Sequence, residues 1–278
     1  MAVWKKLILS ILTSIIHHIM REIKDINEIR NIQLSILDDI HTFCQTHNIR
    51  YSLAFGSLLG AVRHGGYIPW DDDIDICMPR ADYERFLQSY RNRGVYQLRD
   101  RSITSEHYYT FAKIVDGRTM VSEPDVSGHT TGVWVDVFPI DYVPDGQRSR
   151  RCLFWFKNVL YKMRMCKLLP GTSLHSAFAT FCYRFFPLSA PCVDRLLRIL
   201  ICRTTPTSTM SCLTENIRTP RNCFPAVVFD NIKEYSFEGR TFMGVVDADA
   251  YLTCHYGNYM QLPPEDQRTT HHFQAWWI

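Results

Sequence analysis

"FGSLLGAVRHGGYIPWDDDIDICMP" (residues 55–79) decides the fold, because it sets four aspartates within five residues beside an apolar, glycine-rich run. Like charges this close repel one another, whereas the neighbouring tryptophan and isoleucines favour burial. Alternate side chains of a strand share one face, so we expect Asp71, Asp73 and Asp75 to point one way and Asp72 the other. The stretch therefore predicts carboxylates gathered on a buried strand.

These carboxylates have the chemistry of a metal site. Asp73 and Asp75 alternate with apolar residues, so that the two carboxylates could bind one hard cation between them or two cations together. Oxygen-only ligands favour Mg²⁺ or Mn²⁺ over zinc, and two such ions can hold the attacking and leaving oxygens of a phosphoryl displacement. A further carboxylate, Asp136, stands alone in the apolar "VWVDVF" (133–138). Because an unpaired buried carboxylate is costly, we expect Asp136 to have a partner.

A phosphate-binding site is predicted upstream of the acids. Gly56 and Ser57 lie where a strand is expected to enter a helix. Glycine lets a phosphate approach the backbone, the helix N-terminus favours an anion, and the serine hydroxyl can donate a hydrogen bond. The order of strand, Gly-Ser, helix, alternating acids and then a lone acid in a strand is more informative than any one of these pieces.

Other interpretations of these residues have weaker support. A solvated acidic turn conflicts with the apolar neighbours, an EF-hand loop would need glycine where Ile76 stands, and a helical prenyl-diphosphate site conflicts with Pro69 and the alternating pattern. Asp136 could instead be a structural acid paired with an arginine. Three aromatic residues are either core residues or a cation–π box for a quaternary ammonium: Tyr67, Trp70 and Trp134.

Composition fits one large domain or a domain with an insertion. The chain has 278 residues, of which 46% are hydrophobic and 21% charged, with a net charge of +3. The charge is uneven, because residues 148–203 carry eleven Lys or Arg against one acid. A segment this basic meets nucleic acid, anionic lipid or a phosphorylated substrate. It has no RNA-binding signature, so the remaining interpretations are membrane docking by basic amphipathic helices or core helices with solvated basic faces.

The cysteines and the N-terminus bear on location. None of the ten cysteines forms a C-x-x-C pair, and scattered cysteines without a clear signal peptide indicate reduced, cytosolic thiols. Residues 1–20 contain Lys5-Lys6 and an apolar run, Leu7 to Ile16, that is too short to span a membrane. We expect either a membrane-surface helix or a helix packed on the domain.

Hydrophobic periodicity and Gly/Pro punctuation predict the remaining elements. Helices are expected at residues 22–47, 57–64, 79–91 and 247–257, the last ending at Gly257, with two or three more between 148 and 203. Strands are expected at residues 50–55, 73–78, 108–116 and 132–141, the last ended by Pro139. Residues 204–211 are predicted to be a loop and residues 237–245 a hairpin.

Four stretches resemble the LicD family of phosphocholine transferases, to which the fukutin-type ribitol-phosphate transferases are related. They are "GSLLGAVRHGGYIPWDDDIDICMPRADYERF", "FAKI", "WVDVFPID" and "YGNYMQLPPEDQR…HH". Their order, hG[GS]…DhDh…hDh, is that of the nucleotidyltransferase fold of DNA polymerase β-like enzymes. The resemblance covers residues 28–142 and 235–272 in pieces and leaves the basic middle unmatched.

The resemblance implies an α+β nucleotidyltransferase core with a mixed sheet flanked by helices, plus a basic helical insertion. The catalytic domain would comprise residues 21–147 and 224–278, and the insertion residues 148–223. The implied activity is transfer of phosphocholine, or a related alcohol phosphate, from CDP-choline or another CDP-alcohol to a hydroxyl of a glycan or lipid-linked glycan, with release of CMP. By this resemblance, the reaction would belong to a process such as lipopolysaccharide biosynthesis. We expect the protein to be cytoplasmic and peripheral at the inner face of the membrane, and we expect no nucleic-acid partner.

The resemblance also carries roles to individual residues. Asp73 and Asp75 would be metal ligands, and Asp136 a third ligand or a base for the acceptor hydroxyl. The donor phosphates would meet Gly56, Ser57, Arg63, His64 and Lys113, although Lys113 could equally be a surface lysine. Four residues have a less defined place, either near the metal, beside the choline cation or in a tail: Asp71, Asp72, His271 and His272.

Two rival functions stay open at this point. One is a nucleotidyltransferase that moves a nucleoside monophosphate, and the other is a non-catalytic membrane-associated protein of the same fold. The complete set of three acids speaks against the second.

Overall fold

The central sheet is built around one long strand, β8 (Trp134–Val143), in which every residue but Tyr142 is buried. This computed structural model describes residues 20–101, 107, 109–122, 130–168, 189–202, 205–214, 222–268, 270 and 273–278. Strand β8 pairs with β3 (Asp75–Pro79) in parallel and with β5 (Ala112–Asp116) and β9 (Thr209–Ser211) in antiparallel orientation. The predicted helix at residues 1–20, apart from residue 20, and the pair His271 and His272 lie outside the described residues.

The sequence predicted that Pro139 ends this strand, but β8 continues to Val143. A proline lacks the N–H that a central strand needs. Here β5 pairs with β8 only as far as Val137, and β9 begins to pair at Asp141. Pro139 therefore lies in the interval between two partners on that side of β8, where no ladder hydrogen bond is lost.

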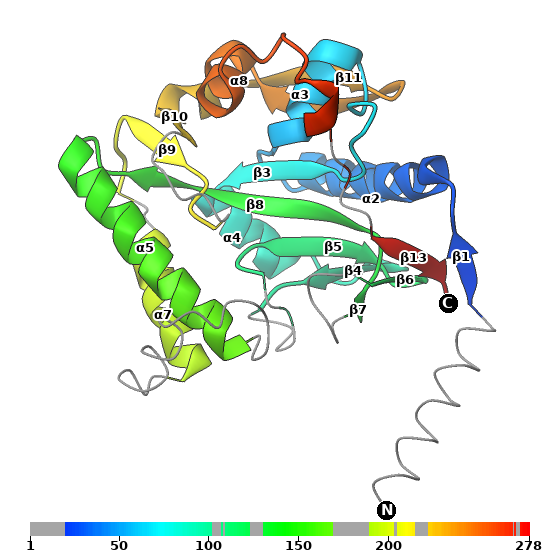
Figure 1. Cartoon of the computed structure of the whole chain (residues 1–278), viewed down its shortest axis with the longest axis horizontal. Helices are drawn as coiled ribbons and strands as arrows, with labels where there is room; N and C mark the ends of the chain where they lie inside the picture. Colours follow the sequence, from blue (N-terminus) through cyan, green and yellow to red (C-terminus); the bar gives the residue numbers. More distant parts are fainter. Residues whose placement is uncertain are drawn as a thin grey trace, which may run out of the picture.

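The other strands complete a mixed sheet of seven strands and two smaller sheets (Figure 1). In the large sheet, β2 (Ser52–Leu53) pairs with β3, β4 (Tyr96–Arg99) with β5, and β10 (Cys223–Pro225) with β9. A four-stranded antiparallel sheet has the order β1 (Arg21–Ile23), β13 (Gln274–Trp277), β6 (Thr119–Ser122) and β7 (Thr130–Thr131). The third is a hairpin of β11 (Ile232–Phe237) and β12 (Arg240–Val245), which confirms the predicted hairpin.

Six α-helices lie around these sheets in the described part of the chain. They are α2 (Ile26–Thr46), α3 (Phe55–His64), α4 (Arg80–Ser89), α5 (Gln147–Leu168), α7 (Ala190–Ile201) and α8 (Ala248–Tyr256). Figure 1 shows α3, α8 and the β11–β12 hairpin gathered beyond β3, while α5 and α7 lie at another end of the large sheet. The mixed α/β architecture agrees with the predicted class.

Two further predicted boundaries differ from the structure because of strand pairing. The first helix was expected from residue 22, but Arg21–Ile23 pair with the C-terminal strand β13, and the Asp25 carboxylate caps the helix by accepting the Asn27 N–H at 2.9 Å. The loop expected at residues 204–211 ends in strand β9, because Thr209–Ser211 find hydrogen-bonding partners on β8. Both differences come from pairing with distant strands.

Two further observations concern the thiols and the membrane. The eight cysteines whose side chains the structure describes are free, as the sequence predicted. Across the described residues, each helix is either too short or too polar to span a lipid bilayer.

Candidate active site

A cavity of about 470 Å³ opens beside the first residues of β3 and receives four carboxylates: Asp71, Asp73, Asp75 and Asp136. Its remaining wall is largely aromatic and apolar, with Gly56 and Phe55 at the start of α3. The sequence predicted these four acids and Gly56 as site residues, and the fold brings all five to one place.

Strand pairing creates the inner cluster of acids. In the ladder, Asp136 of β8 lies opposite Asp75 of β3 on one side and opposite Lys113 of β5 on the other. Directly paired residues direct their side chains to the same face of a sheet. Asp73 reaches this face from the preceding loop, so that one carboxylate oxygen from each of Asp73, Asp75 and Asp136 lies within 4.8 Å of the others.

This donor set fits a hard divalent cation. Three carboxylates so close repel strongly in a half-buried cavity, and a cation between them would remove that repulsion. All the ligand atoms are oxygens, which favours Mg²⁺ or Mn²⁺ over softer metals. Asp73, Asp75 and Asp136 are therefore the residues that could hold such an ion.

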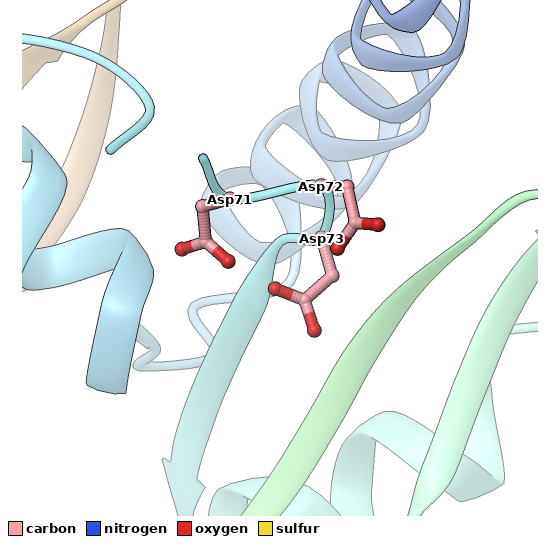
Figure 2. A group of neighbouring side chains, drawn as sticks. All are labelled: Asp71, Asp72 and Asp73. Atoms are coloured by element: carbon pink, nitrogen blue, oxygen red, sulfur yellow. The ribbon is translucent and has the colours of Figure 1, made fainter. Parts of the chain in front are cut away.

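The acids before β3 occupy a loop, because β3 begins only at Asp75. Figure 2 shows the carboxylates of Asp71, Asp72 and Asp73 along this loop, where one carboxylate oxygen of each residue lies within 4.8 Å of those of the other two. The prediction that Asp72 points away from Asp71 and Asp73 is therefore wrong, because residues 71–73 lie in a loop and do not alternate as in a strand. Asp71 lies against Gly56, where an added Cβ would stand 2.7 Å from Asp71 Oδ2. Only glycine leaves room for that carboxylate.

Backbone hydrogen bonds fix the acidic loop in place. Arg30 Nη2 of α2 donates to the Asp71 carbonyl at 2.6 Å, and Gln33 Nε2 donates to the Asp72 carbonyl at 2.8 Å. The hydroxyl of Ser57 accepts the Asp75 N–H at 2.8 Å, and its side chain is buried. Ser57 therefore holds the start of β3, and its contact with a donor phosphate stays a prediction.

Lys113 is the partner that Asp136 needs. Its side chain is 2% exposed, and Nζ lies 2.9 Å from Asp136 Oδ1, while Trp134 Nε1 donates to Asp136 Oδ2 at 3.1 Å. The ammonium also lies over the rings of Trp134 and Tyr109, at 3.9 Å and 4.2 Å from their centroids. The alternative of a surface lysine is therefore wrong, and the partner of Asp136 is a lysine and not the arginine considered as one alternative.

The predicted aromatic box for a quaternary ammonium is not assembled. The three rings lie over three different cations of the chain: Trp134 over Lys113, Tyr67 over Arg30, and Trp70 over Arg268. A cation–π site needs its rings turned toward one cation. These rings instead stabilise cationic side chains around the acids.

Arg63 and His64 do not line the cavity. They occupy the last turn of α3, seven residues beyond Gly56 and so about 10 Å further along the helix axis. Arg63 donates through Nη1 to the Tyr259 carbonyl at 2.7 Å and through Nε to His64 Nε2 at 2.9 Å. The prediction that Arg63 and His64 meet the donor diphosphate therefore stays a prediction.

His255 of α8 lines the cavity and was missed by the sequence analysis. Its Nδ1 donates to the Tyr251 carbonyl at 2.8 Å, and its ring stacks on that of Tyr251 with centroids 4.3 Å apart. Desolvation by burial lowers the pKa of His255, an effect that the bond to the Tyr251 carbonyl partly opposes. The only available signal was its position directly before the "YGNYM" stretch that resembles the family, since nothing local connects it with acids 119 to 184 residues earlier in the chain.

Comparisons with known proteins agree with this geometry. A family model described as "LicD/FKTN/FKRP, nucleotidyltransferase domain" matches residues 48–180, which include the four acids. The chain is 29% identical to the lipopolysaccharide cholinephosphotransferase LicD of Haemophilus influenzae, over 88% of this chain and 95% of that protein. It is also 35% identical to the human ribitol 5-phosphate transferase FKRP, over 33% of this chain and 17% of that protein. The predicted resemblance to this family is confirmed, and with it the class of enzymes that transfer phosphate-containing groups.

Proposed function

Since this chain carries a LicD-family nucleotidyltransferase domain, we propose that it transfers an alcohol phosphate from a CDP-linked donor to a hydroxyl of a cell-surface glycan or glycolipid, with release of CMP. Phosphocholine is the first candidate for the transferred group, because the relative matched over most of both chains is a cholinephosphotransferase. The observation that carries the proposal is the meeting of Asp73, Asp75 and Asp136 in one cavity beside the start of α3. A DNA polymerase β-like core at residues 21–147 and 224–278, with a basic insertion at 148–223, belongs to the same proposal.

The three acids would hold Mg²⁺ or Mn²⁺. When bound, such an ion supplies positive charge that polarises a phosphoryl oxygen and neutralises a leaving phosphate. The chain's own residues prepare this place: Arg30 and Gln33 fix the acidic loop, and Lys113 balances one of the carboxylates. The absence of a side chain at Gly56 keeps the cavity open beside Asp71, where a donor phosphate could approach the start of α3.

A basic helix supports contact with a membrane surface, where a lipid-linked acceptor would be found. Trp155 of α5 is 61% exposed, and helical spacing places Arg148, Arg151 and Lys162, all exposed, on the same side of the helix. The sequence of α5 contains no acidic residue. A tryptophan among lysines and arginines suits an anionic bilayer surface, so we propose α5 as the contact.

Vesicle co-sedimentation tests this contact. The chain should bind vesicles that contain phosphatidylglycerol and bind pure phosphatidylcholine vesicles weakly. The double variant Trp155→Ala/Arg151→Glu should bind the anionic vesicles less than the wild type does. The variant Leu153→Met, at a buried position of the same helix, should bind them as the wild type does. Equal binding by all three proteins would contradict the proposal.

Product analysis tests the transfer reaction. The chain is incubated with Mg²⁺, a glycan acceptor and CDP-choline, CDP-ribitol, CDP-glycerol or CDP-ethanolamine in turn. CMP release with the alcohol phosphate on the acceptor supports the proposal, whereas nucleotide on the acceptor indicates the rival nucleotidyltransferase. The variant Asp73→Asn should lose transfer, and Asp230→Asn, an exposed acid outside the cavity, should retain it.

Donor binding provides a test that needs no acceptor. A true donor at about 100 times its dissociation constant should stabilise the folded chain by roughly 2.7 kcal/mol. Thermal shift with each CDP-alcohol, with and without Mg²⁺, therefore identifies the donor. If none of them stabilises the chain, the proposed donor class is wrong.

A further inference from the structure

His255, a residue of the carboxylate cavity wall, has a ring nitrogen that makes no hydrogen bond within the described part of the chain. Nδ1 is committed to the Tyr251 carbonyl, and because a carbonyl only accepts hydrogen bonds, Nδ1 carries the hydrogen. The opposite ring nitrogen, Nε2, is buried and makes no hydrogen bond within the described part of the chain.

The surroundings of the ring favour the neutral imidazole. It stacks on Tyr251 and meets Phe55 edge to face with centroids 5.2 Å apart. Burial among these rings lowers the pKa of His255. With Nδ1 protonated and the ring neutral, Nε2 holds a free lone pair.

Asp136, the residue first considered as the base, is less suited to receive a proton. Its Oδ1 is paired with the Lys113 ammonium, and its Oδ2 accepts the Trp134 N–H. Both carboxylate oxygens of Asp136 therefore already have partners. Asp73 and Asp75 complete the candidate metal cluster with it. His255 is the neutral nitrogen acceptor among the described residues that line this cavity.

We propose that Nε2 of His255 accepts the proton of the acceptor hydroxyl, a role that rests on the proposed function. The hydroxyl oxygen bonds to the phosphorus of the donor as its O–H bond breaks, and the proton passes to Nε2. The P–O bond to the nucleotide breaks, and its electron pair leaves on the phosphate of CMP. The imidazolium then releases its proton to water.

The tautomer is tested without any substrate. Histidine ¹⁵N chemical shifts are recorded at pH 7 on the full-length chain, and the signals of His255 are assigned by their loss in His255→Asn. We expect an unprotonated Nε2 and a protonated Nδ1. A protonated Nε2, in either the other tautomer or the imidazolium, would overturn the proposal.

The role in transfer is tested with two variants that keep different contacts. In His255→Asn the side chain can still donate to the Tyr251 carbonyl, whereas His255→Phe retains the stacking, and neither has an Nε2. Each should lower the single-turnover rate of transfer by roughly 10²- to 10⁴-fold, with CDP-choline affinity by calorimetry changed less than about twofold. His41→Asn is the matched control, because His41 is also partly buried and hydrogen-bonded, to the Tyr51 hydroxyl at 2.6 Å, but is not in the cavity wall.

The outcomes separate the two proposals. Wild-type transfer rates in a folded His255→Asn or His255→Phe chain would overturn the role of His255 and leave the proposed function standing. Absence of transfer by the wild-type chain with every CDP donor would overturn the proposed function and this role together.

Discussion

Replacing Asp141 by Asn should destabilise the fold strongly without touching the cavity. Asp141 of β8 and Arg80, the first residue of α4, form a bidentate pair, with Nε to Oδ1 at 2.8 Å and Nη2 to Oδ2 at 2.6 Å. Their side chains are 0% and 8% exposed. The pair ties the end of β3, through α4, to β8 five residues beyond Asp136, and so supports the two strands that carry the acids.

The magnitude follows from the charge that is left behind. The substituted amide would be neutral, and among the described residues the buried Arg80 guanidinium would keep the acid Glu84, at 3.4 Å, as its ion-pair partner. Breaking a buried ion pair from one side costs about 3–5 kcal/mol, a large part of the roughly 5–15 kcal/mol that a folded domain has in total. At roughly 2–4 °C per kcal/mol, the melting temperature should fall by about 6–20 °C.

Urea denaturation followed by circular dichroism measures the loss, with two control proteins. The double variant Arg80→Met/Asp141→Leu should recover most of the stability, because no buried charge remains. Glu22→Gln removes an exposed pair with Lys24 and should cost no more than about 1 kcal/mol. A loss below about 1 kcal/mol in Asp141→Asn, or a double variant no more stable than the single one, would refute the reasoning.

Three other substitutions test the site and its supports. Lys113→Met leaves Asp136 without its cation, so the free energy of unfolding of the metal-free protein should fall by about 3–5 kcal/mol. Mg²⁺ should then raise the melting temperature of this variant more than that of the wild type, and equal increases would contradict this. Gly60→Ala should lower the free energy of unfolding in urea by about 1–3 kcal/mol despite the helix propensity of alanine, because its Cβ would lie 2.3 Å from the Gly66 carbonyl oxygen; unchanged stability would show that the backbone yields. Burial lowers the pKa of His107 to about 4, so as pH falls from about 6.5 the unfolded chain takes up the proton first and stability is lost, by about 3 kcal/mol at pH 4. Denaturation at pH 7 and pH 4 should therefore give a smaller loss in His107→Gln, and equal losses would argue against a buried neutral imidazole.

Local sequence patterns determined much of this fold. The Gly-Ser pair in the first turn of α3, the proline that precedes α4, the Glu-Gly hairpin and the glycine after α8 are each set by residues within one or two turns of chain. The acidic stretch likewise indicated its chemistry, because oxygen ligands in an apolar setting have few other uses. Such features depend on backbone preferences and burial, which a short window contains.

The partners of these residues were decided only by the tertiary structure. Asp136 was known to need a partner, but Lys113 became that partner through the register of β5 on β8, and Asp75 joined the cluster through the register of β3. Pro139 was interpreted as a strand end because the interval between two neighbouring strands cannot be seen in one chain segment.

What the sequence by itself determined is therefore the chemical kind of this protein: an acidic, phosphate-compatible site on a mixed α/β fold of a recognisable family. What the tertiary structure decided is which groups act together there, from the cations over each aromatic ring to His255, which α8 brings to the acids. The physical reason is that burial and turn chemistry are local properties of a sequence. Strand register and helix packing join residues far apart in the chain, and only the folded molecule fixes them.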